Sequence, residues 1–273
     1  MRQEVRLATR EDVTRMDLID EQRGPLWWYE LPLQDELYII GIDTAEGKIR
    51  DRRAGHVDVS GRDPDFNAAC VIAESDGREV ARYMSNYAPA LYSADMIALG
   101  TFYGTASGCR DVAFLVPERN AIGAAVIDDL MEAQYSRIFL QRRFNRLEGV
   151  IEKTVGFRTG PENRDILIKD LQRDILEGTC LIKDRMTAKH VASMRRNSMG
   201  KAEAASGAHD DLAMAFMLAQ MGRRHIRIEA GLDDEEPAPR RSQAERDAEF
   251  AAKVYGSGPD DFSDVDPADD HPF

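Results

Sequence analysis

The sequence predicts an α/β domain in which helices cover both faces of a mixed β-sheet. Three apolar, strand-like segments follow closely on one another at residues 36–43, 66–74 and 79–87. From residue 90 onward, segments with helical spacing alternate with short apolar segments. The first pattern is typical of an antiparallel meander and the second of βα units, so together they favour a sheet with both kinds of strand pairing.

The first three strands are predicted from their composition and from the turns between them. The segment at residues 36–43, ELYIIGID, is apolar, contains β-branched residues and ends at a carboxylate, as expected for a buried central strand. Ser75-Asp76-Gly77 is a typical turn between the second and third strands. The polar segment 48–65 is longer than most hairpin connections, and we expect it to be a surface loop.

The second half of the chain is predicted to alternate between helices and strands. Apolar residues recur at helical spacing in four segments, and short apolar runs separate them. The expected helices are 90–105, 121–134, 161–177 and 209–221, and the expected strands are 111–118, 137–141 and 179–183. Pro161 opens one helix and Gly178 follows its end, which are favoured positions for these residues.

The two ends of the chain differ from this middle. Residues 1–35 mix charges with Gly, Pro and Trp without a clear period, so we expect a lead-in segment or linker and no core element there. Residues 36–230 carry the organised pattern and are expected to form the folded domain. Residues 231–273 are rich in Pro, Gly and acid and poor in large aliphatic residues, which predicts a disordered tail.

The net charge of −13 is unevenly distributed along the chain. Residues 231–273 hold 13 acidic and 4 basic residues, which leaves 36 acidic and 32 basic residues before them. A nearly neutral body can bind phosphate groups if its basic residues gather on one face, so charge alone neither supports nor excludes a nucleic-acid partner.

Cysteine usage and hydropathy favour a cytosolic protein without a structural zinc site. The three cysteines are far apart and form no CxxC pair, so we expect reduced thiols. The sequence contains no apolar run of about 18 residues, as a membrane span would need. The first residues also lack the apolar stretch of a secretory signal.

Four acidic residues at the ends of predicted elements are candidate catalytic residues. Asp43 and Glu118 each end a predicted strand, and Asp210 and Asp211 begin the last predicted helix. Taken singly, each could be a turn former or a helix cap. Two strand-end carboxylates from neighbouring strands, however, converge on one cleft, where their repulsion costs free energy unless a proton or a cation neutralises it.

Carboxylates in such a cleft suit hydrolysis assisted by a hard metal ion. Mg²⁺ and Mn²⁺ prefer oxygen ligands, and two such ions about 3.5–4 Å apart can activate a water and stabilise the leaving oxygen in phosphodiester cleavage. The sequence has no GxSxG motif, and none of its five histidines pairs with another at metal-ligand spacing. Serine and zinc hydrolases are therefore disfavoured.

The order of these motifs resembles the nuclease domain of phage terminase large subunits, which belongs to the ribonuclease H-like superfamily. The resemblance runs from residue 38 to residue 219 and rests on four segments: IGIDTAEG, FLVPERN, EKTVGFRTGPENRDILIKDL and SGAHDDLAMAFMLA. It implies a ribonuclease H-like mixed sheet for residues 36–230. It also implies metal-binding roles for the following acids: Asp43, Glu118 and Asp211, with Asp210 as an additional ligand and Asp65 at a place where the family often has an acid.

The resemblance further implies a metal-dependent endonuclease that cleaves double-stranded, concatemeric viral DNA during packaging in the host cytoplasm. The implied cofactor is Mg²⁺ or Mn²⁺, with two ions bound beside substrate. The implied partners are a packaging ATPase domain or subunit, the small terminase and the portal. The chain has no GxxxxGK[ST] motif, so we expect any ATPase to be a separate chain or domain.

Candidate DNA-binding residues are basic and follow from two sources. Lys153 and Arg164 are implied by the resemblance, whereas Arg185, Arg195 and Arg196 belong to a basic stretch that could grip phosphates without reading sequence.

Three other functions compete with the nuclease. A Holliday-junction resolvase would use a similar acid cluster but would need a dimer to cut two strands symmetrically. An actin-like or Hsp70-like ATPase is suggested by IGIDTAEG, although no second Asp-Gly-Gly phosphate loop follows. A non-catalytic module that docks DNA or a packaging partner would have acids that serve only as caps.

Overall fold

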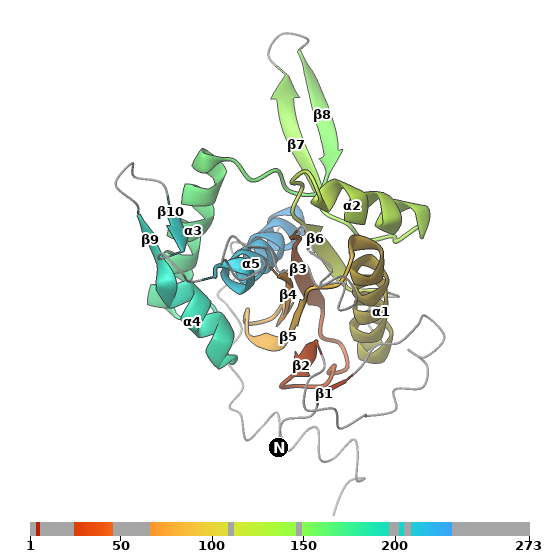
Figure 1. The fold of residues 1–273 in the computed structure, drawn as a ribbon, viewed down its shortest axis with the longest axis vertical. Helices are drawn as coiled ribbons and strands as arrows, with labels where there is room; N and C mark the ends of the chain where they lie inside the picture. The colour runs from red at the N-terminus through yellow and green to blue at the C-terminus, as the bar shows by residue number, and fades with distance from the viewer. Residues whose placement is uncertain are drawn as a thin grey trace, which may run out of the picture. The chain divides into compact units, whose positions relative to one another are not determined.

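A computed structural model describes residues 4–5, 25–45, 66–108, 112–145, 149–196, 202–204 and 209–230 of the protein. Its main sheet has six strands: β1 (Glu4–Val5), β2 (Leu26–Trp28), β3 (Tyr38–Asp43), β4 (Asn67–Ala73), β5 (Glu79–Ser85) and β6 (Phe114–Pro117). Their order is β1-β2-β5-β4-β3-β6 (Figure 1). All neighbouring strands are antiparallel except β3 and β6, which are parallel. The predicted mixed sheet is therefore confirmed.

Helices cover both faces of this sheet, as predicted. They are α1 (Pro89–Ser107), α2 (Gly123–Glu132), α3 (Pro161–Glu177), α4 (Arg185–Ser193) and α5 (Asp211–Glu229). In Figure 1, α5 lies on one side of the sheet, with α3 and α4 beyond it, and α1 and α2 lie on the other side. None of the described helices is long and apolar enough to cross a membrane.

The side chains of β3 alternate between two apolar cores, one on each face of the sheet. Tyr38, Ile40 and Ile42 pack with residues of α1 and α2. Ile39 packs with residues of α3 and α5 on the other face. This alternation follows from the two-residue period of a strand. β3 is buried on both faces, as its sequence predicts, but it lies between β4 and the edge strand β6 rather than at the centre of the sheet.

The segment before residue 36 contributes to the sheet, contrary to expectation. β2 pairs with β5, and its Leu26 is buried in the core. The expectation that no core element precedes residue 36 is therefore wrong for this strand. β2 has only three residues, and its position is set by pairing with β5 rather than by a periodic pattern of its own.

The region after α2 also differs from the prediction. Only Ile138 of the expected strand 137–141 bridges to β6, and the chain then forms a hairpin from β7 (Leu140–Asn145) and β8 (Val150–Val155) that projects from the sheet (Figure 1). The predicted strand 179–183 is reduced to one bridge between Leu181 and Arg78. The helix α4 and the short pair β9 (Met194–Arg196) and β10 (Ala202–Ala204) were not predicted.

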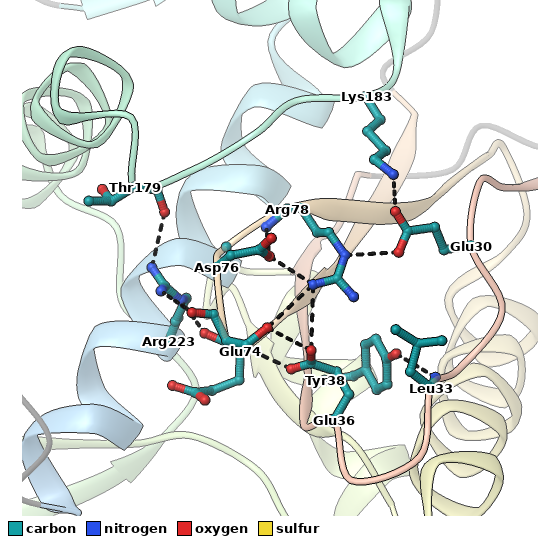
Figure 2. A network of polar contacts seen from close by, with 12 residues as sticks. Glu30, Leu33, Glu36, Tyr38, Glu74, Asp76, Arg78, Thr179, Lys183 and Arg223 are labelled. Atoms are coloured by element: carbon teal, nitrogen blue, oxygen red, sulfur yellow. Dashed lines mark hydrogen bonds and ion pairs between the residues drawn. The ribbon is translucent and has the colours of Figure 1, made fainter. Parts of the chain in front are cut away.

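A network of charged side chains fixes the end of the sheet where β3 begins (Figure 2). The guanidinium of the buried Arg78 forms ion pairs with three acids: Glu30, Glu36 and Asp76. From α5, the guanidinium of Arg223 donates to three backbone carbonyl groups: those of Glu74, Ser75 and Thr179. The network ties the β4–β5 turn to α5, at the opposite end of β3 from Asp43.

A buried carboxylate explains why residues 179–184 bend towards α4 instead of extending the sheet. Glu79, the first residue of β5, accepts hydrogen bonds from the backbone N–H groups of Lys183 (3.1 Å) and Asp184 (2.8 Å) and from the Thr187 hydroxyl (2.7 Å). Asp184 in turn caps α4 by accepting from the backbone of Met186 and Thr187. The start of α4 is thus fixed to the central sheet.

We predict that Gly41→Ala destabilises the protein, because α5 packs directly on the backbone of β3 at this position. A Cβ atom on Gly41 would lie 2.0 Å from the Ala215 carbonyl oxygen and 2.5 Å from the Ala219 nitrogen. We expect the free energy of unfolding in urea to fall by about 2 kcal/mol or more. Gly160→Ala is the control, since nothing lies within 4 Å of its added Cβ. Equal stability of both variants would contradict the packing described.

We predict that Glu79→Gln also destabilises the protein when measured at pH 8. Burial raises the pKa of Glu79 to about 7, so at pH 8 its carboxylate is ionised and only accepts hydrogen bonds. The Gln amide would turn an NH₂ group towards N–H and O–H donors, and we expect the free energy of unfolding to fall by about 1–3 kcal/mol. Glu177→Gln, at an exposed position, should leave stability unchanged.

Candidate active site

The register of the two parallel strands brings Asp43 and Glu118 to the same edge of the sheet. Ile42 is aligned with Pro117, and the Glu118 N–H donates to the Ile42 carbonyl (2.8 Å). Both acids therefore follow the last paired residues of neighbouring strands. Asp43 is half-buried and Glu118 is buried, and the Glu118 carboxyl lies near enough to raise the pKa of Asp43.

The helix α5 brings two further acids to this edge. It runs along β3, and the small residues Gly41, Ala215 and Ala219 allow the backbones of strand and helix to touch. As a result the helix begins beside the end of the strand, with Asp211 buried as its first residue and Asp210 directly before it.

The four acids form one electrostatic unit. Burial, together with the charges of Glu118, Asp211 and Asp210, raises the pKa of the Asp43 carboxyl well above its usual value. Like charges in a partly desolvated site have this effect because each ionised carboxylate disfavours the next. The geometry therefore gathers the four acids predicted from sequence into a site that favours a proton or a cation.

Glu118 is not the cap of the helix that follows it. In the turn that leads into α2, Asn120 Oδ1 accepts hydrogen bonds from the backbone N–H groups of Ile122 (3.1 Å) and Gly123 (2.6 Å). The Asn120 Nδ2 group donates to the Glu118 carboxylate (3.0 Å) and to the Thr44 carbonyl (2.9 Å). One amide thus orients Glu118 and joins the ends of β3 and β6.

The backbone beside the other acids is also held by neutral side chains. Asn67 accepts from the Ala45 N–H (3.1 Å) and donates to the Tyr87 carbonyl (2.7 Å), which fixes the turn after Asp43. Within α5, Asp210 occupies the N-cap position but its side chain makes no capping hydrogen bond. The Leu212 N–H donates instead to His190 Nδ1 (3.3 Å).

Sequence reasoning did not identify Asn67, Asn120 or His190. Asn120 could have been found, because Asn is a preferred cap and here directly precedes a predicted helix. Asn67 lies in a predicted strand, and His190 is on a helix that was not predicted, so neither has a local sequence signal.

Of the predicted DNA-binding residues, Arg164 lies closest to the acids. It comes from the first turns of α3 and forms an ion pair with Asp210, while its buried Nε has no hydrogen-bond partner among the described residues. Lys153 is exposed on β8, and Arg185 is exposed as the first residue of α4. The side chains of Arg195 and Arg196 lie outside the described part of the structure, as does Asp65.

A histidine completes the surroundings of the helix start. His209 Nδ1 lies 3.6 Å from the Asp211 carboxylate, and its ring meets that of Phe66 edge to face at 5.7 Å. The sequence had given no reason to select His209.

The donor set suits a hard divalent cation in its chemistry. Carboxylate oxygens are the ligands that Mg²⁺ and Mn²⁺ prefer. Across the described residues, however, no three side chains of the His, Cys, Asp or Glu types are close enough together to hold an ion. The acids therefore lie near enough to repel one another, but their carboxylate oxygens are not close enough together to coordinate one ion.

Comparison with known proteins identifies the fold. No model of a protein family matches the sequence, and no curated protein matches it significantly. Among solved structures, the large terminase nuclease from thermophilic phage G20c with bound magnesium is 19% identical, with a TM-score of 0.53 over 74% of this chain and 89% of that chain. The cobalt-bound form of that nuclease is 18% identical, with a TM-score of 0.54 over the same shares.

A further structure of the G20c nuclease is 20% identical and has a TM-score of 0.50, over 74% of this chain and 90% of that chain. Each of these comparisons covers most of both chains, so the likeness extends over most of the nuclease domain. The chain therefore has the ribonuclease H-like fold of the phage large terminase nuclease, as the sequence resemblance implied.

Proposed function

We propose that this protein is a metal-dependent endonuclease of the phage terminase type. The observation that carries the proposal is the gathering of Asp43, Glu118, Asp210 and Asp211 at one edge of the sheet, where three of these acids raise the pKa of the fourth. The fold supports the same conclusion, since it is the fold of a nuclease whose structures hold magnesium or cobalt.

Each acid has a defined role in this proposal. Asp43, Glu118 and Asp211 would hold Mg²⁺ or Mn²⁺, Asp210 would be an additional ligand, and Asp65 remains a prediction. When bound, two such ions would neutralise the site, activate a water and stabilise the leaving oxygen of a phosphodiester. The chain itself orients Glu118 through Asn120 and balances Asp210 with Arg164 until substrate arrives.

The proposed substrate is double-stranded DNA, bound through its phosphates. Arg164 is half-buried beside the acids and forms an ion pair with Asp210, which places a guanidinium where the phosphate to be cleaved would bind. Lys153 and Arg185 project from β8 and α4 and would contact the backbone further away, as would Arg195 and Arg196. Phosphate contacts carry no sequence information, so we expect little sequence preference.

The proposed setting is the packaging of concatemeric viral DNA in the host cytoplasm. The packaging ATPase, the small terminase and the portal are the proposed partners. A resolvase would instead prefer four-way junctions over plasmid DNA and would cut as a dimer. Cleavage of a linear duplex and of a junction of matched sequence, measured side by side, separates the two.

We predict that Asp43→Asn abolishes cleavage of supercoiled plasmid. With Mn²⁺ or Mg²⁺ the wild type should linearise the plasmid and with EDTA it should not, while the variant should lose more than about 100-fold in rate. The unfolding midpoint of the metal-free variant should not fall, because the substitution removes a carboxyl whose pKa is raised by neighbouring acids.

Asp128→Asn provides the matched control, since Asp128 is exposed on α2 and should be dispensable for cleavage. Absence of metal-dependent cutting by the wild type, or cutting that survives Asp43→Asn, would refute the nuclease and favour a DNA-docking module. In such a module Asp43 would serve as a structural cap. Asp43→Asn should then lower the free energy of unfolding by about 1 kcal/mol.

We predict that Arg164→Gln weakens DNA binding and lowers its salt dependence. Loss of one phosphate contact should reduce the slope of log K against log salt by about 1. The measurement is fluorescence anisotropy of a labelled duplex in Ca²⁺ at several NaCl concentrations. Arg173→Gln makes the same charge change at an exposed position of the same helix, and an equal effect of both variants would rule out a specific role for Arg164.

A further inference from the structure

His190 occupies a position that determines how α5 begins. It lies near the end of α4, is buried, and its Nδ1 accepts the backbone N–H of Leu212 at 3.3 Å. Its ring also stacks on that of His209, with the centroids 6.2 Å apart. Leu212 directly follows Asp211, so this hydrogen bond fixes the first turn of the helix that carries the acids.

The start of a helix leaves N–H groups that need acceptors, and acidic side chains commonly provide them. Here Asp210 makes no capping hydrogen bond within α5 and pairs with Arg164, while the Asp211 carboxylate lies beside His209. A carboxylate used as the cap would turn an oxygen towards its own backbone. At Leu212 the imidazole of His190 performs this task in place of a carboxylate.

The ring is suited to act as an acceptor. Burial, followed by the charge of His209, lowers the pKa of His190 to about 4, so the ring is neutral at physiological pH. A neutral ring protonated on Nε2 keeps a lone pair on Nδ1, whereas an imidazolium has none to offer. The neutral ring also adds no positive charge to compete with a cation for the acids.

Contacts with the central sheet help to set the position of His190. Asp184 caps α4, and the buried Glu79 of β5 holds the backbone just before that helix. At the other end, the Ser193 hydroxyl contacts the His190 carbonyl (2.7 Å) and the His209 carbonyl (3.4 Å). The central sheet thus places α4, and α4 places the ring that receives the Leu212 N–H.

We infer that His190 is a positioning residue for the metal site: by accepting the Leu212 N–H it caps α5 and leaves the Asp210 and Asp211 carboxylates available to a divalent cation. This inference rests on the proposed function. It assigns His190 no contact with the metal or with DNA, and it requires only an acceptor at the δ position of residue 190.

The test compares His190→Asn with His190→Leu. The two side chains have nearly the same shape, but Asn keeps an acceptor at the δ position and Leu has none. Two quantities are measured below the unfolding midpoint of each variant: the affinity for Mn²⁺ by titration calorimetry, and the rate of hydrogen exchange of the Leu212 amide without metal. A role confined to stability would lower the midpoint without changing the affinity of the folded protein.

We expect His190→Leu to weaken Mn²⁺ binding by about tenfold or more and to speed exchange at Leu212, while His190→Asn stays within about threefold of the wild type in both. Equal affinities of wild type and His190→Leu would overturn the inference, as would equal losses in both variants. If His190→Leu does not fold, His190→Gln takes its place as the variant without a δ acceptor. The side-chain carbonyl of Gln lies one carbon further from the backbone. A wild type that binds no Mn²⁺ would instead refute the proposed function, and the role of His190 with it.

Discussion

The direct contact between the backbones of α5 and β3 is the constraint on which the site depends. Gly41 has no side chain, and even a single added carbon would lie 2.0 Å from the Ala215 carbonyl oxygen. Because helix and strand touch here, the start of α5 lies beside the end of β3, and Asp211 is near enough to raise the pKa of Asp43. The parallel pairing of β6 with β3 then adds Glu118 to the same edge.

A second principle organises the polar groups around the acids. Neutral side chains satisfy the backbone at each place where a carboxylate would ordinarily do so: Asn67 after Asp43, Asn120 at the start of α2, and His190 at the start of α5. The acids are left to interact with one another and with Arg164 and His209. Repulsion among them is the physical reason that such a site favours a cation.

The sequence was informative where the signal is local. The apolar strand 36–43 could be predicted directly, because burial on both faces leaves a continuous apolar run. The acids could be singled out because they stand at the ends of such elements. The exposed side chains of β8 and the three-residue strand β2 carry no such pattern, since pairing partners define them. His190 is even less accessible to sequence reasoning, because its partner Leu212 is brought near only by the packing of α4 on α5.

The use of neutral caps has an evolutionary consequence. Since Asn67, Asn120 and His190 hold the backbone beside the acids, we expect exchange of the acids for amides to leave the shape of the chain intact. Under the proposed function, a lineage that lost the acids would keep a folded protein that binds a phosphate backbone without cleaving it. On this architecture, a cutting enzyme and a mere holder of DNA are separated by very few substitutions.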